Sequence, residues 1–179
     1  MLFHLYLLKS IKKVDNFTSN PMHTHLGALS LRSIMAILTG INTHGDYGLT
    51  ITDAAGNMMQ TDIPIEQGGT GGGVRPMQAV LAALIGCSSV DIVGILKKQK
   101  QEITSLKIEV DGEREPGKEP SLWKTVRLRI ILDGRIDPAK AHRATVLSME
   151  KYCSVAETLR RAGAEITFTV EVNGQPFQP

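Results

Sequence analysis

The sequence predicts an α+β fold, in which two long helices cover a largely antiparallel sheet. Three observations lead to this prediction. The segments follow the order βββ, helix, ββ, helix, β; neighbouring strands have hairpin-like connections; and two segments combine helical spacing with helical end signals. With 179 residues, of which 42% are hydrophobic, the chain can bury one core of ordinary size.

The N-terminal segment, residues 1–33, mixes polar residues and scattered leucines without a sustained period. We therefore expect an extension here, followed by one domain over residues 34–179. Its apolar run precedes its lysines, which is the reverse of a secretory signal, and is too short to span a bilayer, so a cytoplasmic location is expected. His23 and His25 have no companion cysteine or carboxylate, so no metal site is predicted.

Three strands are predicted next, over Ile34–Ile41, Tyr47–Thr52 and Met58–Ile63, as an antiparallel meander rich in β-forming residues. The glycine-rich loop Gln67–Val74 follows. A glycine loop before a helix suits a phosphate, but this one lacks the lysine and hydroxyl pair of a P-loop. We interpret it as a connector, beside which Arg75 could hold a small anion.

A long helix is predicted over Arg75–Gln101, beginning with a proline and ending with lysines that suit the negative end of the helix dipole. Apolar residues go most of the way round it, and Asp91 alone interrupts them before the lysines. Such a helix is buried, and it has more apolar surface than one sheet face covers. A second subunit is its natural cover, so we expect a homodimer.

The second half of the chain predicts a hairpin, Leu106–Val110 with Val126–Leu132, joined by the charged loop Gly112–Pro120. A second helix is predicted at about 138–162, because Asp137 and Pro138 form a start signal and Gly163 a stop signal. The strand Glu165–Val172 alternates apolar and polar residues and completes the sheet.

The chain has two cysteines, Cys87 and Cys153, one in each predicted helix. Two cysteines are too few for a disulfide scaffold, which favours a reducing compartment. Each could be an inert buried thiol. Both helices must face the same sheet, however, so the thiols could approach within disulfide distance. Glu150, three residues before Cys153, would share its helical face.

Three segments resemble the OsmC/Ohr family of osmotically inducible and organic hydroperoxide resistance proteins. They are PMQAVLAALIGCSSVDIVGILKK, the GER segment at Gly112–Arg114, and LSMEKYCSVAETL. The resemblance runs from about Ile34 to Val172, and the residues around the two cysteines are most similar to the OsmC-like branch of the family. It implies an intertwined homodimer with active sites at the subunit interface.

The resemblance also implies a cofactor-free reduction of organic hydroperoxides in oxidative-stress defence. Cys87 would attack the peroxide as a thiolate, Cys153 would resolve the sulfenic acid as a disulfide, and an external dithiol would reopen that bond. The family's hydroperoxidases also use a glutamate and an arginine. Here Gln78 stands near the helix start and His44 in the early turn, so Gln78, His44, Arg75 and Glu150 are the predicted supporting residues.

Two function classes follow. The first is a thiol peroxidase for organic hydroperoxides, and the second is a non-catalytic dimer that binds a small apolar ligand at the subunit interface. The charges are interspersed and sum to +2, so neither a nucleic acid nor a membrane partner is expected. The pKa of the Cys87 thiol would separate the two classes, because only a thiolate is a useful nucleophile.

Overall fold

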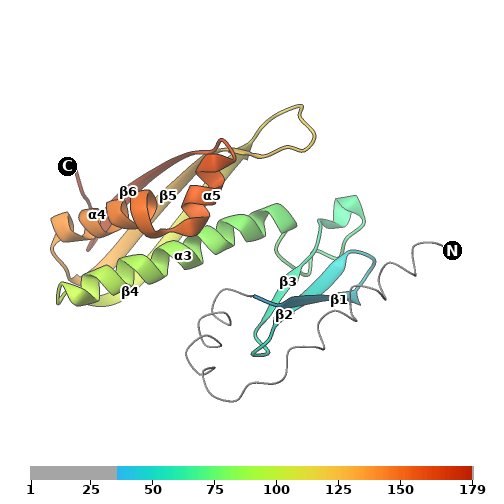
Figure 1. Ribbon diagram of the computed structural model, residues 1–179, viewed down its shortest axis with the longest axis horizontal. Helices are drawn as coiled ribbons and strands as arrows, with labels where there is room; N and C mark the ends of the chain where they lie inside the picture. Colours follow the sequence, from blue (N-terminus) through green and yellow to red (C-terminus); the bar gives the residue numbers. More distant parts are fainter. Residues whose placement is uncertain (1–35, 179) are drawn as a thin grey trace, which may run out of the picture. The chain divides into compact units, whose positions relative to one another are not determined.

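The computed structural model describes residues 36–178 (Figure 1). The predicted N-terminal extension, residues 1–33, and the two histidines in it lie outside the described residues. The predicted order of strands and helices is found, with strand boundaries that differ by a few residues.

The first sheet contains three strands, β1 (Leu38–His44), β2 (Gly48–Asp53) and β3 (Met58–Thr61), in the order β1-β2-β3. A short 3₁₀ turn, η1 (Ile65–Gln67), and the glycine-rich loop follow.

The glycine-rich loop is organised by a buried carboxylate of its own chain, that of Asp62. This carboxylate accepts hydrogen bonds from the backbone N–H groups of Ile63, Thr70 and Gly72, and from the hydroxyl of Thr70 at 2.6 Å. These bonds, led by that of the Thr70 hydroxyl, hold the pKa of Asp62 well below its usual range. The backbone N–H groups of Thr70 and Gly72 in the loop thus bind the Asp62 carboxylate of the same chain. This supports the interpretation of the loop as a connector over that of a phosphate-binding loop.

The second sheet has four strands in the order β4-β5-β6-β7: β4 (Glu102–Arg114), β5 (Trp123–Arg135), β6 (Glu165–Val172) and β7 (Gln175–Pro176). Strands β4 and β5 form the predicted hairpin, but both are longer than their alternating segments. Strands β5 and β6 are parallel, with Thr125 opposite Glu165, because the connection between them is a helical crossover rather than a hairpin.

The helices α3 (Pro76–Lys98), α4 (Pro138–Leu147) and α5 (Ser154–Arg161) cover one face of this sheet (Figure 1). Helix α3 buries Leu84, Ile92 and Leu96 completely. Against them lie alternate residues of β5, namely Val126, Leu128, Ile130 and Leu132. By length and composition α3 would also suit a membrane span, a test that the core helix of a soluble protein passes as well.

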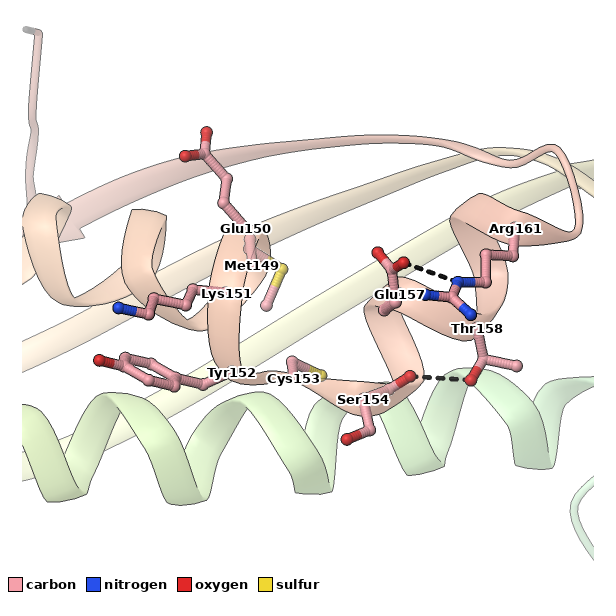
Figure 2. A pocket seen from close by; sticks show the side chains of 9 residues that line it. All are labelled: Met149, Glu150, Lys151, Tyr152, Cys153, Ser154, Glu157, Thr158 and Arg161. Atoms are coloured by element: carbon pink, nitrogen blue, oxygen red, sulfur yellow. Dashed lines mark hydrogen bonds and ion pairs between the residues drawn. The ribbon is translucent and has the colours of Figure 1, made fainter.

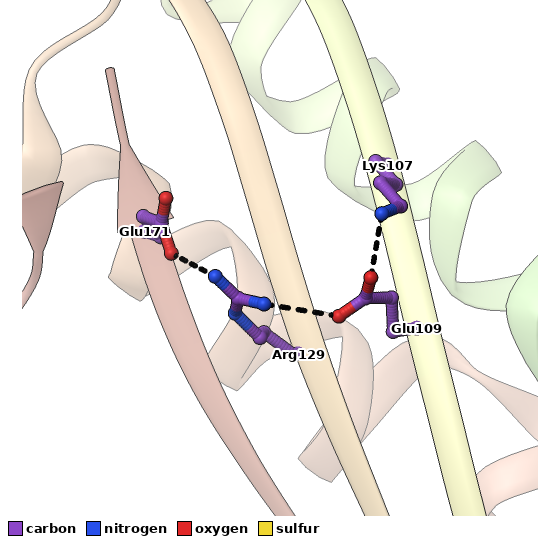
Figure 3. A network of polar contacts seen from close by, with 4 residues as sticks. All are labelled: Lys107, Glu109, Arg129 and Glu171. Carbon is purple, nitrogen blue, oxygen red and sulfur yellow. Dashed lines mark hydrogen bonds and ion pairs between the residues drawn. The ribbon is translucent and has the colours of Figure 1, made fainter. Parts of the chain in front are cut away.

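The opposite face of the sheet carries charged side chains. Arg129 lies between Glu171, at 2.7 Å, and Glu109, at 3.2 Å, and Lys107 contacts the other oxygen of Glu109 (Figure 3). The two pairs that Glu109 makes are exposed, and exposed ion pairs contribute little to stability. This charged face of the sheet is suited to water, and the thiols lie on the helical side.

The second predicted helix is not continuous. It divides into α4, a π-helical turn over Ser148–Tyr152 and α5. The Cys153 N–H donates to the Ser148 carbonyl at 2.8 Å, and Arg160 donates to the Met149 carbonyl at 2.6 Å. Cys153 has an extended backbone and becomes the N-cap of α5. The prediction of one continuous helix at about 138–162, with Cys153 inside it, was therefore wrong.

Candidate functional site

The two thiols lie together with one carboxylate between α3 and the start of α5. The sulfur atoms of Cys87 and Cys153 and a carboxylate oxygen of Asp91 all lie within 4.8 Å of one another. Cys87 and Asp91 are four residues apart, so they occupy the same face of α3, one turn apart. The expected approach of the two thiols is therefore found, and we call these three residues the thiol trio.

The Cys153 thiol is buried, and its sulfur accepts a hydrogen bond from the Ala156 N–H at 3.4 Å. Figure 2 shows Cys153 in the short segment before α5, above the ribbon of α3. Burial, and next the neighbouring Cys87 thiol, raise the pKa of Cys153 to about 11. Cys153 is therefore protonated at neutral pH. Cys87 is half-buried, so it is the more accessible thiol of the pair.

Asp91 is the trio member that the sequence analysis did not assign to the site. The Ser148 hydroxyl, from the π-helical turn, donates to its Oδ2 at 3.0 Å and so fixes the carboxylate beside the thiols. The sequence did carry a signal, because Asp91 is the charge that interrupts an apolar helix one turn after Cys87. The partner hydroxyl could not be found from sequence, since Ser148 lies 57 residues away.

The other predicted supporting residues are not members of the trio. The Gln78 side-chain oxygen accepts from the Arg75 backbone N–H at 3.4 Å, so Gln78 helps to cap α3. It lies nine residues before Cys87, or about 13 Å along the helix axis. Arg75 is the N-cap of α3 and is exposed.

His44 ends β1, where its Nδ1 lies 2.9 Å from the Thr43 hydroxyl and its buried Nε2 has no hydrogen-bond partner among the described residues. Glu150 is exposed in the π-helical turn, and Figure 2 shows its carboxylate pointing away from Cys153. Because the helix is interrupted between them, Glu150 and Cys153 do not share a helical face. Supporting roles for these four residues stay predictions.

Two surface pockets flank the trio. One, of about 490 Å³, includes Cys153, Ser154 and Tyr152 in its wall (Figure 2). Arg161 in the same wall pairs with Glu157 at 2.7 Å, so its charge is already matched. The other, of about 520 Å³, reaches Asp91 and is lined by the apolar residues Val90, Ile95, Leu147 and Tyr152 as well as by Lys98 and Gln99. An apolar molecule in this second pocket would lie next to the trio.

A two-helix face that holds paired thiols over an antiparallel-rich sheet defines a class of small α+β proteins with redox-capable cysteines. The family model described as OsmC-like protein matches residues 69–169, and this chain belongs to that family. The resemblance drawn from the cysteine segments is thereby confirmed.

Individual relatives agree with this assignment. Protein YhfA of Escherichia coli (strain K12) is 41% identical over 98 residues, which cover 54% of this chain and 72% of YhfA. An OsmC-like protein from Mycoplasma pneumoniae has a TM-score of 0.65 at 16% identity, with 77% of this chain and 96% of that chain covered.

An organic hydroperoxide resistance protein OsmC from Legionella pneumophila has a TM-score of 0.59 at 19% identity, with 77% of this chain and 97% of that chain covered. These two structures share the fold, so the predicted α+β, OsmC-like fold is confirmed.

Proposed function

We propose that this protein is a cytoplasmic, homodimeric thiol peroxidase that reduces organic hydroperoxides in oxidative-stress defence. The observation that carries the proposal is the approach of Cys87 and Cys153 to within 4.8 Å, since a resolving thiol must reach the sulfenic acid that its partner forms. Membership of the OsmC-like family supports the same reaction.

In the first step the Cys87 thiolate attacks one oxygen of the hydroperoxide. The O–O bond breaks, Cys87 becomes a sulfenic acid, and the departing alkoxide takes up a proton and leaves as an alcohol. The more accessible thiol suits this role, whereas the raised pKa of Cys153 keeps that thiol protonated until it is needed.

In the second step Cys153 loses its proton and its sulfur attacks the sulfenic sulfur. A disulfide forms and the hydroxyl group leaves as water once protonated. Asp91, within 4.8 Å of both sulfurs, would take up the thiol proton through one bridging water and pass it on. An external dithiol then reduces the disulfide by thiol exchange, so the cycle converts a hydroperoxide and two thiols of the reductant into an alcohol, water and a disulfide.

The pocket beside Asp91 supports an organic substrate rather than hydrogen peroxide. Its apolar side chains would bury an alkyl group with the peroxide end placed toward Asp91, which lies beside the thiols. The same pocket is the observation that favours the second candidate function, a non-catalytic dimer that binds a small apolar ligand. In that case the thiols would not consume peroxide.

Intact-mass spectrometry after one equivalent of cumene hydroperoxide, without air, tests the proposal. The wild type should lose about two mass units as the disulfide closes. Cys153→Ser should keep an added oxygen at Cys87, and Cys87→Ser should stay unmodified. If the wild type remained fully reduced, the peroxidase would be excluded in favour of the binder. A stable oxygen adduct in the wild type would instead remove Cys153 from the resolving role.

A further inference from the structure

We infer that the reduced thiol trio is a zinc site, in which the sulfur atoms of Cys87 and Cys153 and a carboxylate oxygen of Asp91 bind one Zn²⁺ ion. This inference does not depend on the proposed peroxidase reaction, because it concerns the reduced protein without peroxide.

The donor atoms are of the right kind and nearly in place. Zinc is bound in proteins by thiolate sulfur and carboxylate oxygen, usually by four ligands in a tetrahedron. With metal–ligand bonds of about 2.0 to 2.3 Å, the ligand atoms of such a site lie about 3.5 to 4 Å apart. The trio's atoms already lie within 4.8 Å of one another, so side-chain rotations that shorten these distances by about 1 Å would close the site.

The surroundings hold two of the three ligands in position. The Ser148 hydroxyl donates to one oxygen of Asp91 at 3.0 Å, which leaves the other oxygen free for a metal. The Ala156 N–H donates to the Cys153 sulfur at 3.4 Å, a bond that a thiolate accepts better than a thiol. Hydrogen bonds of this kind to metal ligands fix their orientation and raise affinity.

The fourth position would face outward. Cys153 is buried, but Cys87 and Asp91 are half-buried, and the pocket of about 520 Å³ reaches Asp91. The trio is the ligand set found among residues 36–178, so a water molecule would complete the tetrahedron. A site with three protein ligands and one water is open and exchangeable, unlike a closed structural zinc site.

The sequence analysis predicted no metal site, because it considered only His23 and His25, which have no companion cysteine or carboxylate. The fold supplies the site by joining α3 to the start of α5. Metal binding must also displace two thiol protons, so affinity should rise with pH. Zinc and a disulfide use the same two sulfurs, so they exclude each other.

Titration of the reduced protein with Co²⁺ under anaerobic conditions, followed by competition with Zn²⁺, tests the inference. Thiolate-to-cobalt charge-transfer absorption should appear with one ion per chain and with release of about two protons. Zn²⁺ should then displace the cobalt. After oxidation with diamide, which closes disulfides without peroxide, the absorption should be lost.

Variants locate the metal within the trio. Asp91→Asn keeps both sulfurs and nearly the same shape, and it should weaken binding by about tenfold or more. Ser148→Ala should weaken it by about tenfold, because the carboxylate is no longer oriented. Glu150→Gln is the matched control, since it removes a carboxylate near Cys153 that points away, and it should bind as the wild type does.

The inference fails if the reduced wild type does not bind one Co²⁺ per chain at micromolar protein. It also fails if Asp91→Asn binds as tightly as the wild type, or if Glu150→Gln loses as much affinity as Asp91→Asn. Circular dichroism of each variant separates a lost ligand from a lost fold. Because no step uses peroxide, a failure here leaves the peroxidase proposal standing, and the reverse also holds.

Discussion

The protonated state of Cys153 follows from where its side chain lies. The sulfur is buried at the start of α5, beside a second thiol, and both surroundings disfavour a charge on it. One backbone N–H donates to it, and this bond favours the thiolate without overcoming the burial. A thiol held in this way is poorly reactive by itself and becomes useful only when its partner has been oxidised.

The first prediction concerns stability at high pH. The folded-state pKa of Cys153 is about 11, whereas the ordinary value is 9.0. Below pH 9 the thiol is protonated in both states, so no stability is lost. Between pH 9 and 11 the unfolded thiol ionises first, which favours unfolding by about 3 kcal/mol once the pH exceeds 11.

Cys153→Ser is the matched variant, because serine can still cap α5 but does not ionise. The difference in free energy of unfolding between wild type and variant, measured with urea from pH 7 to 11, should shift against the wild type only above pH 9. A difference that stays flat over this range would show that Cys153 is not buried as described.

How far a residue's role could be predicted differed between the thiols and Asp91. The thiols could be paired from sequence because each lies in a helix that must face the same sheet. Asp91 could not be assigned, because a carboxylate in an apolar helix equally fits a solvent-exposed stripe. The hydrogen bond from the Ser148 hydroxyl, which the π-helical turn brings to Asp91, distinguishes a carboxylate of the thiol site from one on a solvent-exposed stripe.

At the scale of the elements, strand β6 was predicted with the bounds that the structure has, Glu165–Val172. Its apolar and polar residues alternate, and its two ends are marked in the sequence by Gly163 before it and the Asn173-Gly174 turn after it.

The break in the second helix, after α4, was not predictable from the sequence in this way. Between Pro138 and Gly163 there is neither proline nor glycine, so the sequence gives no local reason for the helix to end. The break depends on tertiary bonds, such as that from Arg160 to the Met149 carbonyl.

The second prediction concerns the glycine of the GER segment. A Cβ atom at Gly112 would lie 2.8 Å from the Trp123 ring, a clash between neighbouring strands, and 3.3 Å from Leu81. Trp123 cannot move away freely, because its indole N–H donates to the Met77 carbonyl of α3 at 3.2 Å. Gly112→Ala should therefore cost about 1 to 3 kcal/mol of unfolding free energy.

Chemical denaturation with a matched glycine variant measures this cost. Gly86→Ala in α3 is the control, because an added Cβ there meets no atom within 4 Å and alanine favours a helix. Equal stability of the two variants would mean that the β4–β5 hairpin can open without moving Trp123. If the prediction holds, this glycine joins the sheet to the start of the helix that carries Cys87.

At the scale of the whole molecule, several large apolar side chains are exposed in the single chain. Val90 on α3 is 73% exposed, and Met58 on β3 is 74% exposed. An exposed apolar side chain on a helix that is apolar most of the way round fits the proposed homodimer. The core face of α3 is a different face. Leu84 and Ile92 are fully buried within the chain itself, so substitutions there test folding rather than assembly.

The third prediction uses this difference. Val90→Lys should convert a dimer into a folded monomer, because a lysine is tolerated in water but not in an apolar interface. Light scattering at micromolar concentration, with circular dichroism, measures both properties. Lys118→Ala, in the exposed loop after β4, should remain dimeric. A wild type that is monomeric under these conditions would contradict the proposed assembly.

The distance along the chain between the two thiols has a consequence for heat resistance. A bond between Cys87 and Cys153 would close a ring of about 67 residues, which holds the second half of α3, the β4–β5 hairpin and α4. Closing such a ring removes so much freedom from the unfolded chain that the oxidised protein should be more stable by about 4 kcal/mol. Its melting temperature should therefore exceed that of the dithiothreitol-treated protein, and Cys87→Ser should show no such gap. A protein that has reacted with peroxide would then keep a raised melting temperature until a reductant opened the disulfide.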